Sequence, residues 1–117
     1  MRTNFTMSDN YICMVRGDTL SFGVQIMDDE GKPFAQDLDE ASFSCKSNNA
    51  LNKYVFKKTL GQGITKSGTG KYIVRVAPED TRNEESGKYF YDLEIKVNGD
   101  VFTVLRGVLE LTQDITY

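Results

Sequence analysis

The stretch from Lys88 to Thr112 constrains the fold most, because two alternating apolar runs flank the dipeptide Asn98-Gly99. This dipeptide accepts the positive φ angles that both central positions of a type I′ turn require. A two-residue loop fixes the register of the resulting hairpin. The expected cross-strand pairs are Val97 with Asp100, Ile95 with Phe102, and Leu93 with Val104.

Each arm of this hairpin has an apolar face. In the first arm that face consists of alternate residues: Tyr89, Tyr91, Leu93, Ile95 and Val97. In the second arm the apolar parity changes near Arg106-Gly107, from Phe102 and Val104 to Leu109 and Leu111. A bulge at Gly107 would restore the inward face, since glycine inside a strand often marks a bulge. Without a bulge, both faces of the arm would be partly covered.

Further short runs with strand-like alternation precede the hairpin, at residues 11–15, 19–27, 41–46, 53–60 and 72–77, with a brief run at 64–66 between glycines. The stretch from Pro78 to Gly87 is polar and can form one helical turn. This pattern predicts an all-β fold, an antiparallel immunoglobulin-like β-sandwich of about seven to eight strands. A jelly roll or a small barrel is the alternative.

Composition bounds the class of protein. A chain of 117 residues with 39% hydrophobic residues predicts one folded domain, which we place at residues 11–117 behind an N-terminal arm at 1–10. A net charge of −3 and dispersed basic residues argue against nucleic-acid binding. No apolar run approaches the roughly 20 residues of a membrane span, and the N-terminus lacks the features of a signal peptide. We therefore expect no membrane partner, and synthesis in a cytoplasm.

The two cysteines leave two alternatives open. Cys13 and Cys45 could bridge two sheets of a sandwich, or they could be buried thiols in a reducing compartment, which we favour. The chain has no histidine, so the usual zinc site cannot form. We expect no metal, no cofactor and no catalytic residue, because no nucleophile–base arrangement is visible.

Three motifs suggest ligands but have simpler explanations. Arg16-Gly17-Asp18 matches an integrin-binding tripeptide, yet Gly17 also suits a plain turn. The acids of 28–30 lie in a turn that ends at Pro33 and lack the regular ligand spacing of a calcium loop. The spacing of Gly63 and Gly68 resembles a phosphate loop, but the lysine and the following helix are missing. We interpret all three as turns.

A family resemblance rests on four segments taken in order: RGDTLSFGVQI (16–26), LDEASFSCK (38–46), YIVRVAPEDT (72–81) and GKYFYDLEIKVNGDVFTVLRGVLELTQDIT (87–116). Together they resemble the small immunoglobulin-like domains in virion proteins of tailed bacteriophages, and are similar to the N-terminal domain of the baseplate upper protein family. The resemblance implies a non-enzymatic virion subunit made in the host bacterial cytoplasm. It implies docking on other virion subunits of baseplate, tail, neck or capsid, as a symmetric homo-oligomer or as lattice-bound copies.

The outward face of the hairpin is the expected interface. Its apolar content exceeds that of a typical solvated sheet face, and the candidate residues are Phe90, Val101, Thr103 and Leu105, joined by Phe5 of the arm. The alternative is that this face packs inside the domain. A second functional class, a stand-alone module that binds carbohydrate or another cell-surface ligand, would use exposed aromatics, for which Tyr54, Tyr72 and Tyr117 are the candidates.

Overall fold

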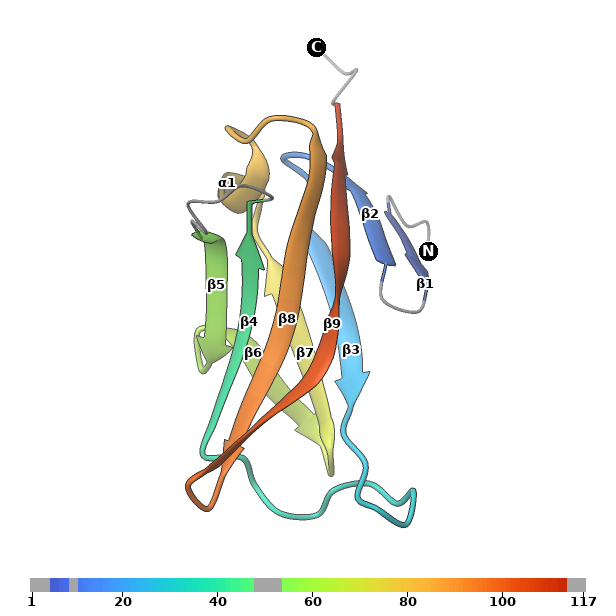
Figure 1. Cartoon of the computed structure of the whole chain (residues 1–117), viewed down its shortest axis with the longest axis vertical. Helices are drawn as coiled ribbons and strands as arrows, with labels where there is room; N and C mark the ends of the chain where they lie inside the picture. The colour runs from blue at the N-terminus through green and yellow to red at the C-terminus, as the bar shows by residue number, and fades with distance from the viewer. Residues whose placement is uncertain (1–4, 9–10, 48–53, 114–117) are drawn as a thin grey trace.

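The computed structural model describes residues 5–8, 11–47 and 54–113, and these form an all-β fold with a single helical turn (Figure 1). The elements in chain order are β1 (Phe5–Ser8), β2 (Tyr11–Val15), β3 (Leu20–Gln25), β4 (Glu40–Lys46), β5 (Tyr54–Leu60), β6 (Gly63–Gly68), β7 (Lys71–Val76), α1 (Pro78–Thr81), β8 (Gly87–Val97) and β9 (Asp100–Thr112). The helical turn lies where the sequence predicted it.

The strands form two layers that are joined at one side. One layer has the order β1-β2-β9-β8-β4-β5 and the other β6-β7-β3, linked by a short parallel pairing of β5 with β6. The remaining pairings are antiparallel except for β2 with β9. In immunoglobulin nomenclature β3, β7 and β6 correspond to strands B, E and D, while β4, β8 and β9 correspond to C, F and G. The predicted immunoglobulin-like β-sandwich is therefore confirmed, with β1 as an additional edge strand.

The β8–β9 hairpin follows the predicted register over its first half. Asn98 and Gly99 have φ angles of 53° and 85°, as a type I′ turn requires. The pairs Val97–Asp100 and Ile95–Phe102 are confirmed. The predicted pair of Leu93 with Val104 is wrong, because the register shifts after Thr103 and Leu93 faces Leu105 instead.

The predicted bulge at Gly107 is likewise wrong. The bulge lies at Val104, which has no partner on β8, whereas Gly107 pairs regularly with Tyr91. Shifting the register at Val104 places Leu105, Leu109 and Leu111 on the inward face with Gly107 between them. The parity change in the sequence did require a bulge, but one placed three residues earlier resolves it equally well.

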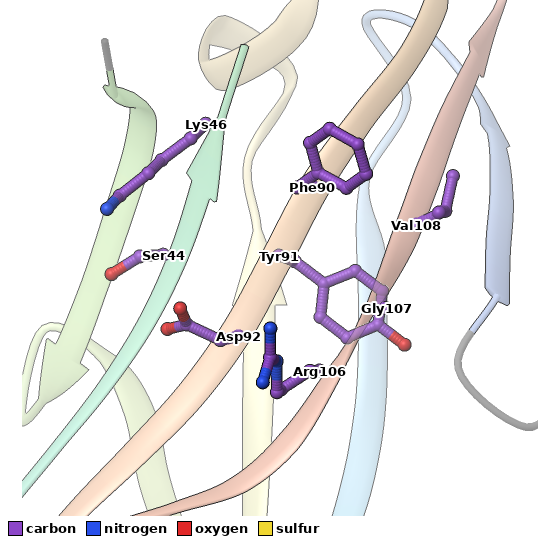
Figure 2. Close-up of a pocket in the computed structure, with 8 residues that line it drawn as sticks. All are labelled: Ser44, Lys46, Phe90, Tyr91, Asp92, Arg106, Gly107 and Val108. Atoms are coloured by element: carbon purple, nitrogen blue, oxygen red, sulfur yellow. The ribbon is translucent and has the colours of Figure 1, made fainter. Parts of the chain in front are cut away.

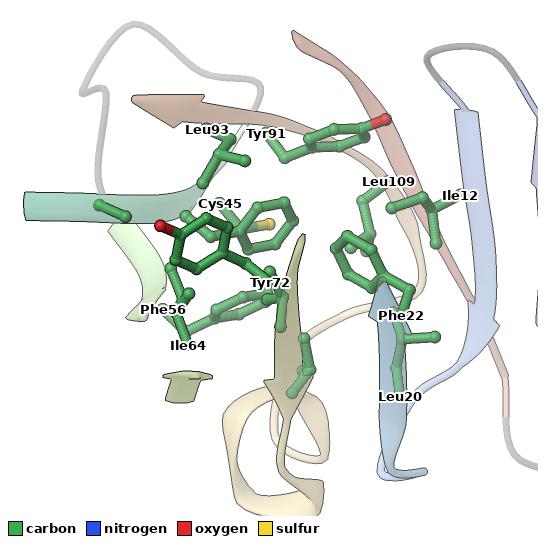
Figure 3. Packing of buried hydrophobic residues seen from close by; sticks show 14 of the residues in the cluster. Ile12, Leu20, Phe22, Cys45, Phe56, Ile64, Tyr72, Tyr91, Leu93 and Leu109 are labelled. Carbon is green, nitrogen blue, oxygen red and sulfur yellow. The ribbon is translucent and has the colours of Figure 1, made fainter. Parts of the chain in front are cut away.

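The core has packed aromatic rings in place of the disulfide of antibody domains. Phe43 on β4 is fully buried and lies 5.4 Å from both Phe22 on β3 and Tyr91 on β8, measured between ring centroids. Figure 3 shows Phe22 and Tyr91 within this core. Antibody domains carry a tryptophan on strand C against a disulfide between strands B and F. Here Phe43 takes the place of the tryptophan, and Phe22 and Tyr91 take those of the cysteines.

Tyr89 forms the hydrogen bond that is characteristic of immunoglobulin folds at the start of strand F. Its hydroxyl donates to the Glu85 carbonyl at 2.6 Å, four residues upstream. This is the geometry of the tyrosine corner, in which the tyrosine precedes the second cysteine position by two residues. The position of Tyr91 in the core agrees with that spacing.

The Arg16-Gly17-Asp18 motif is a structural turn, as we expected. Gly17 has a φ of 83° and its N–H donates to the Thr81 hydroxyl at 2.8 Å. The Arg16 N–H donates to the Thr112 carbonyl and its guanidinium to the Glu84 carbonyl, both at 3.0 Å. The turn thus joins the end of β2 to the end of β9 and to α1.

Part of the expected N-terminal arm belongs to the sheet. Residues 5–8 form β1 and pair antiparallel with β2, while residues 1–4 and 9–10 lie outside the described part of the chain. β2 carries the half-buried Cys13, and β4 carries the buried Cys45. Both thiols are free, so the structure shows no bridge between them, and only Cys45 is buried as the second alternative expected.

Candidate docking surface

Large exposed apolar side chains concentrate on the β8–β9 hairpin. Phe90 is 48% exposed, and the tip of β9 adds Val101 at 58%, Phe102 at 52% and Val104 at 40%. Scattered single apolar residues are normal on a protein surface, but neighbouring ones on a single element indicate a contact surface. We call Phe90 together with residues 101–104 the hairpin surface; Phe90 lies opposite Val108, away from the tip, and Phe102 and Val104 lie on the other side of the sheet from Phe90 and Val101.

The predicted interface residues differ in their exposure. Phe90, Val101 and Thr103 are exposed on the hairpin as predicted. Leu105 is half-buried and packs against the core, so its assignment to the outward face is wrong; the bulge at Val104 turns it inward. The side chain of Phe5 lies outside the described part of the structure.

Two members of the hairpin surface were missed. The sequence placed Phe102 and Val104 on the buried face, and they do lie on the side of Ile95 and Val97. Among the described residues, however, the groove beneath them is lined not by strands of the second layer but by residues that follow β3, such as Met27 and Phe34 in the connection to β4. Figure 1 shows this connection passing close to the hairpin tip. Alternation predicts which side a residue faces but not where the opposing layer ends.

A groove lies between the hairpin tip and the β3–β4 connection. It has a volume of about 390 Å³, and we call it the tip groove. Phe102 and Val104 line one side, and Met27, which is 54% exposed, and Phe34 line the other. Asp28 shapes the connection, because its carboxylate accepts the N–H groups of Glu30 and Lys32 at 2.9 and 3.0 Å. These bonds make the acidic segment a closed turn.

A second hollow of about 320 Å³ lies on the outer face of β4, β8 and β9 (Figure 2). Phe90 and Val108 border it from one side. Its other margin is polar and consists of Ser44, Lys46, Asp92 and Arg106. An apolar centre beside mixed charges is the composition of protein–protein interfaces.

Two ionisable groups beneath this face, Cys45 and Tyr91, belong to the core. Burial, followed by the charge of Glu84, raises the pKa of the Cys45 thiol to about 12. Such a thiol is not an activated nucleophile, because reactivity requires the thiolate. Burial also raises the pKa of Tyr91, whose buried hydroxyl has no hydrogen-bond partner in the described residues. The same residues contain no cluster of three or more side chains able to hold a metal.

The aromatics suggested for ligand binding do not share a surface. Tyr54 is 49% exposed, and the ammonium groups of Lys46 and Lys57 lie 4.9 and 5.4 Å from its ring centroid. Tyr72 is only 4% exposed and belongs to the core, so its assignment as an exposed aromatic is wrong. Tyr117 lies outside the described residues.

β9 has two halves with different neighbours. Residues 108–111 pair with β8 on one side and with β2 on the other, and Thr112 pairs with β2. Residues 100–107 pair with β8 alone, and no other strand of the described chain pairs along their second edge. The most exposed part of the hairpin surface is therefore also an open sheet edge.

Fold and surface together define an immunoglobulin-like β-sandwich with an apolar hairpin. No protein-family model matches the sequence, and no curated protein matches it. Among solved structures the chain is similar to the NK cell receptor Nkp44, described as a triggering partner in natural cytotoxicity. The identity is 22%, the match covers 91% of this chain and 100% of that one, and the TM-score is 0.49. In the described residues, no helix has the length and apolarity to cross a membrane.

Proposed function

We propose that this protein is a non-enzymatic structural subunit of a tailed-phage virion, where it docks on other virion subunits through the hairpin surface. The four sequence segments that resemble phage virion domains support the virion context. The observation that carries the docking role is the exposure of Phe90, Val101, Phe102 and Val104 on one hairpin. The baseplate, tail, neck and capsid are all candidate locations.

The hairpin surface has the physical properties that docking needs. Fully burying a side chain such as valine or phenylalanine contributes roughly 1.5–3 kcal/mol, so a few anchors suffice for a lattice contact. Asp92 and Arg106 beside Phe90 supply a polar rim that can set the orientation of the partner. The short turn at Asn98-Gly99 holds the anchors on a regular ladder, which limits the ordering cost on binding.

Incorporation into particles tests this function. Phages would be assembled in cells that express Phe90→Ser or Val101→Ser, and the content of this protein in purified particles would be measured. Ile73→Ser is the matched control, because Ile73 is 40% exposed on β7 in the other layer. We expect loss from particles for the hairpin variants, unchanged melting temperatures, and normal incorporation of the control.

Two results would count against the proposal. Normal incorporation of both hairpin variants would exclude the hairpin surface as the docking site. A wild-type protein that is absent from particles but binds a glycan array through Tyr54 would instead favour the ligand-binding module.

A further inference from the structure

The open edge of β9 is a second feature of the hairpin, distinct from its apolar side chains. On one side, residues 100–107 pair with β8. On the other side, their backbone N–H and C=O groups face no strand of the described chain. The pairing of β2 begins only at Val108. A sheet edge of this kind is a template for another β-strand.

The register identifies which groups point outward. The pair that closes a two-residue hairpin, here Val97 with Asp100, exchanges hydrogen bonds, and such pairs alternate with pairs that do not. Phe102 therefore bonds to β8, whereas the polar groups of Val101 and Thr103 point away from it. Lys96, the residue opposite Val101, agrees with this alternation. Its carbonyl points away from β9 and accepts the Asp39 N–H at 2.8 Å on the β4 side.

Residues 101–103 of this edge carry none of the side chains that normally prevent pairing. Proteins protect open edges with proline, lysine, inward charges or very short strands. Residues 101–104 contain neither proline nor charge, and their side chains are exposed on both faces. The bulge at Val104 limits the regular part of the edge to the residues before it.

We propose that this edge pairs with the same edge of a second copy about a two-fold axis at Phe102. In this register Val101 and Thr103 of one copy exchange hydrogen bonds with Thr103 and Val101 of the other. The arrangement is self-complementary, because both outward-pointing residues lie at equal distances from the axis, as a closed two-fold interface requires.

The side chains fit the same register. Phe102 meets its own symmetry mate in a non-hydrogen-bonded pair, the kind in which opposing side chains lie closest. Aromatic pairs across strands stabilise a sheet. The inference goes beyond the virion role, since it concerns the isolated protein and holds or fails independently of particle incorporation.

Removing one outward N–H tests the pairing. Sedimentation of the purified full chain over a range of concentrations should show a monomer–dimer equilibrium. Thr103→Pro deletes an N–H that is not used by β8, and should shift the dissociation constant at least tenfold toward monomer. Thr103→Val keeps the N–H and should leave the dimer intact. Phe102→Lys, which brings two like charges together at the axis, should also give monomer if the proline variant misfolds.

Cross-linking tests the register. In a Cys13→Ser background, Phe102→Cys should form an intermolecular disulfide under mild oxidation. Opposing Cα atoms of a non-hydrogen-bonded pair are about 4.5 Å apart, which lies within the range of about 4.4–6.8 Å for disulfides. Val101→Cys should not cross-link, because in this register position 101 lies opposite position 103 of the second copy and is only diagonal to position 101 of that copy. A wild-type chain that stays monomeric at every concentration, or a dimer that survives both Thr103→Pro and Phe102→Lys, would overturn the inference.

Discussion

The two halves of β9 have similar apolar content but different environments. Its C-terminal half lies between β8 and β2, and Leu109 and Leu111 are fully buried. Its N-terminal half is equally apolar, yet Phe102 and Val104 remain exposed beside a free edge. The comparison teaches that the apolar content of a strand does not determine its role. The covered half stabilises the domain, and the open half is available to a partner.

Truncation should separate the two halves most clearly. Leu109→Ala removes buried methyl groups and should lower the free energy of unfolding by about 2–5 kcal/mol. Val101→Ala, at a position 58% exposed, should change it by less than about 0.5 kcal/mol. Urea denaturation of both variants checks this at low protein concentration. Equal losses would contradict the division of β9.

Alkaline pH should weaken the core of the domain next. The pKa of Cys45 is raised from 9.0 to about 12 by burial and by Glu84. The stability that depends on the neutral thiol is therefore full below about pH 9 and is lost as the pH rises toward the folded-state value. The free energy of unfolding should fall above pH 9, and less steeply in Cys45→Ala. Cys13→Ala controls for the loss of a thiol, and identical slopes in the two variants would refute the assignment.

The attachment of β2 to the corner at α1 should have an intermediate effect. Thr81 is fully buried and its hydroxyl accepts the Gly17 N–H. Thr81→Val keeps the shape but leaves that donor unsatisfied, which should cost about 1–3 kcal/mol. Thr81→Ser retains the acceptor and is the control. If Thr81→Val lowers the melting temperature no more than Thr81→Ser does, the hydrogen bond does not hold this end of β2.

The tyrosine corner should give the smallest effect. Tyr89→Phe removes the bond to the Glu85 carbonyl, and the net loss should be about 0.5–1.5 kcal/mol. Lys88→Ala, at an exposed neighbouring position, should be nearly neutral. Chemical denaturation distinguishes the two, and a neutral Tyr89→Phe would remove the corner from the features that stabilise β8.

Local signals predicted much of this fold. Asn98-Gly99 predicted the turn and the first cross-strand pairs, and strict alternation predicted the buried face of β8. The bulge could not be located, because Val104 and Leu105 are both apolar and several bulge positions restore the inward face. The parallel pairing of β2 with β9 was also out of reach, since it joins segments about a hundred residues apart with no local signature.

The candidate surface was predicted only in part. Exposure of Phe90 and Val101 follows from alternation, and the polar neighbours of Phe90 on its face support it. Exposure of Phe102 depends instead on where the second layer ends, which is a property of the whole sandwich. The free edge has the same origin, because it exists only where β2 does not extend along β9.

Amide hydrogen exchange along β9 tests the central claim most directly. In dilute solution the N–H groups of Val101 and Thr103 should exchange quickly, while those of Phe102 and of residues 108–111 should be protected by β8 or β2. Raising the protein concentration should selectively protect Val101 and Thr103. Uniform protection along β9 in the dilute monomer would contradict the account, because it would mean that the edge is already covered.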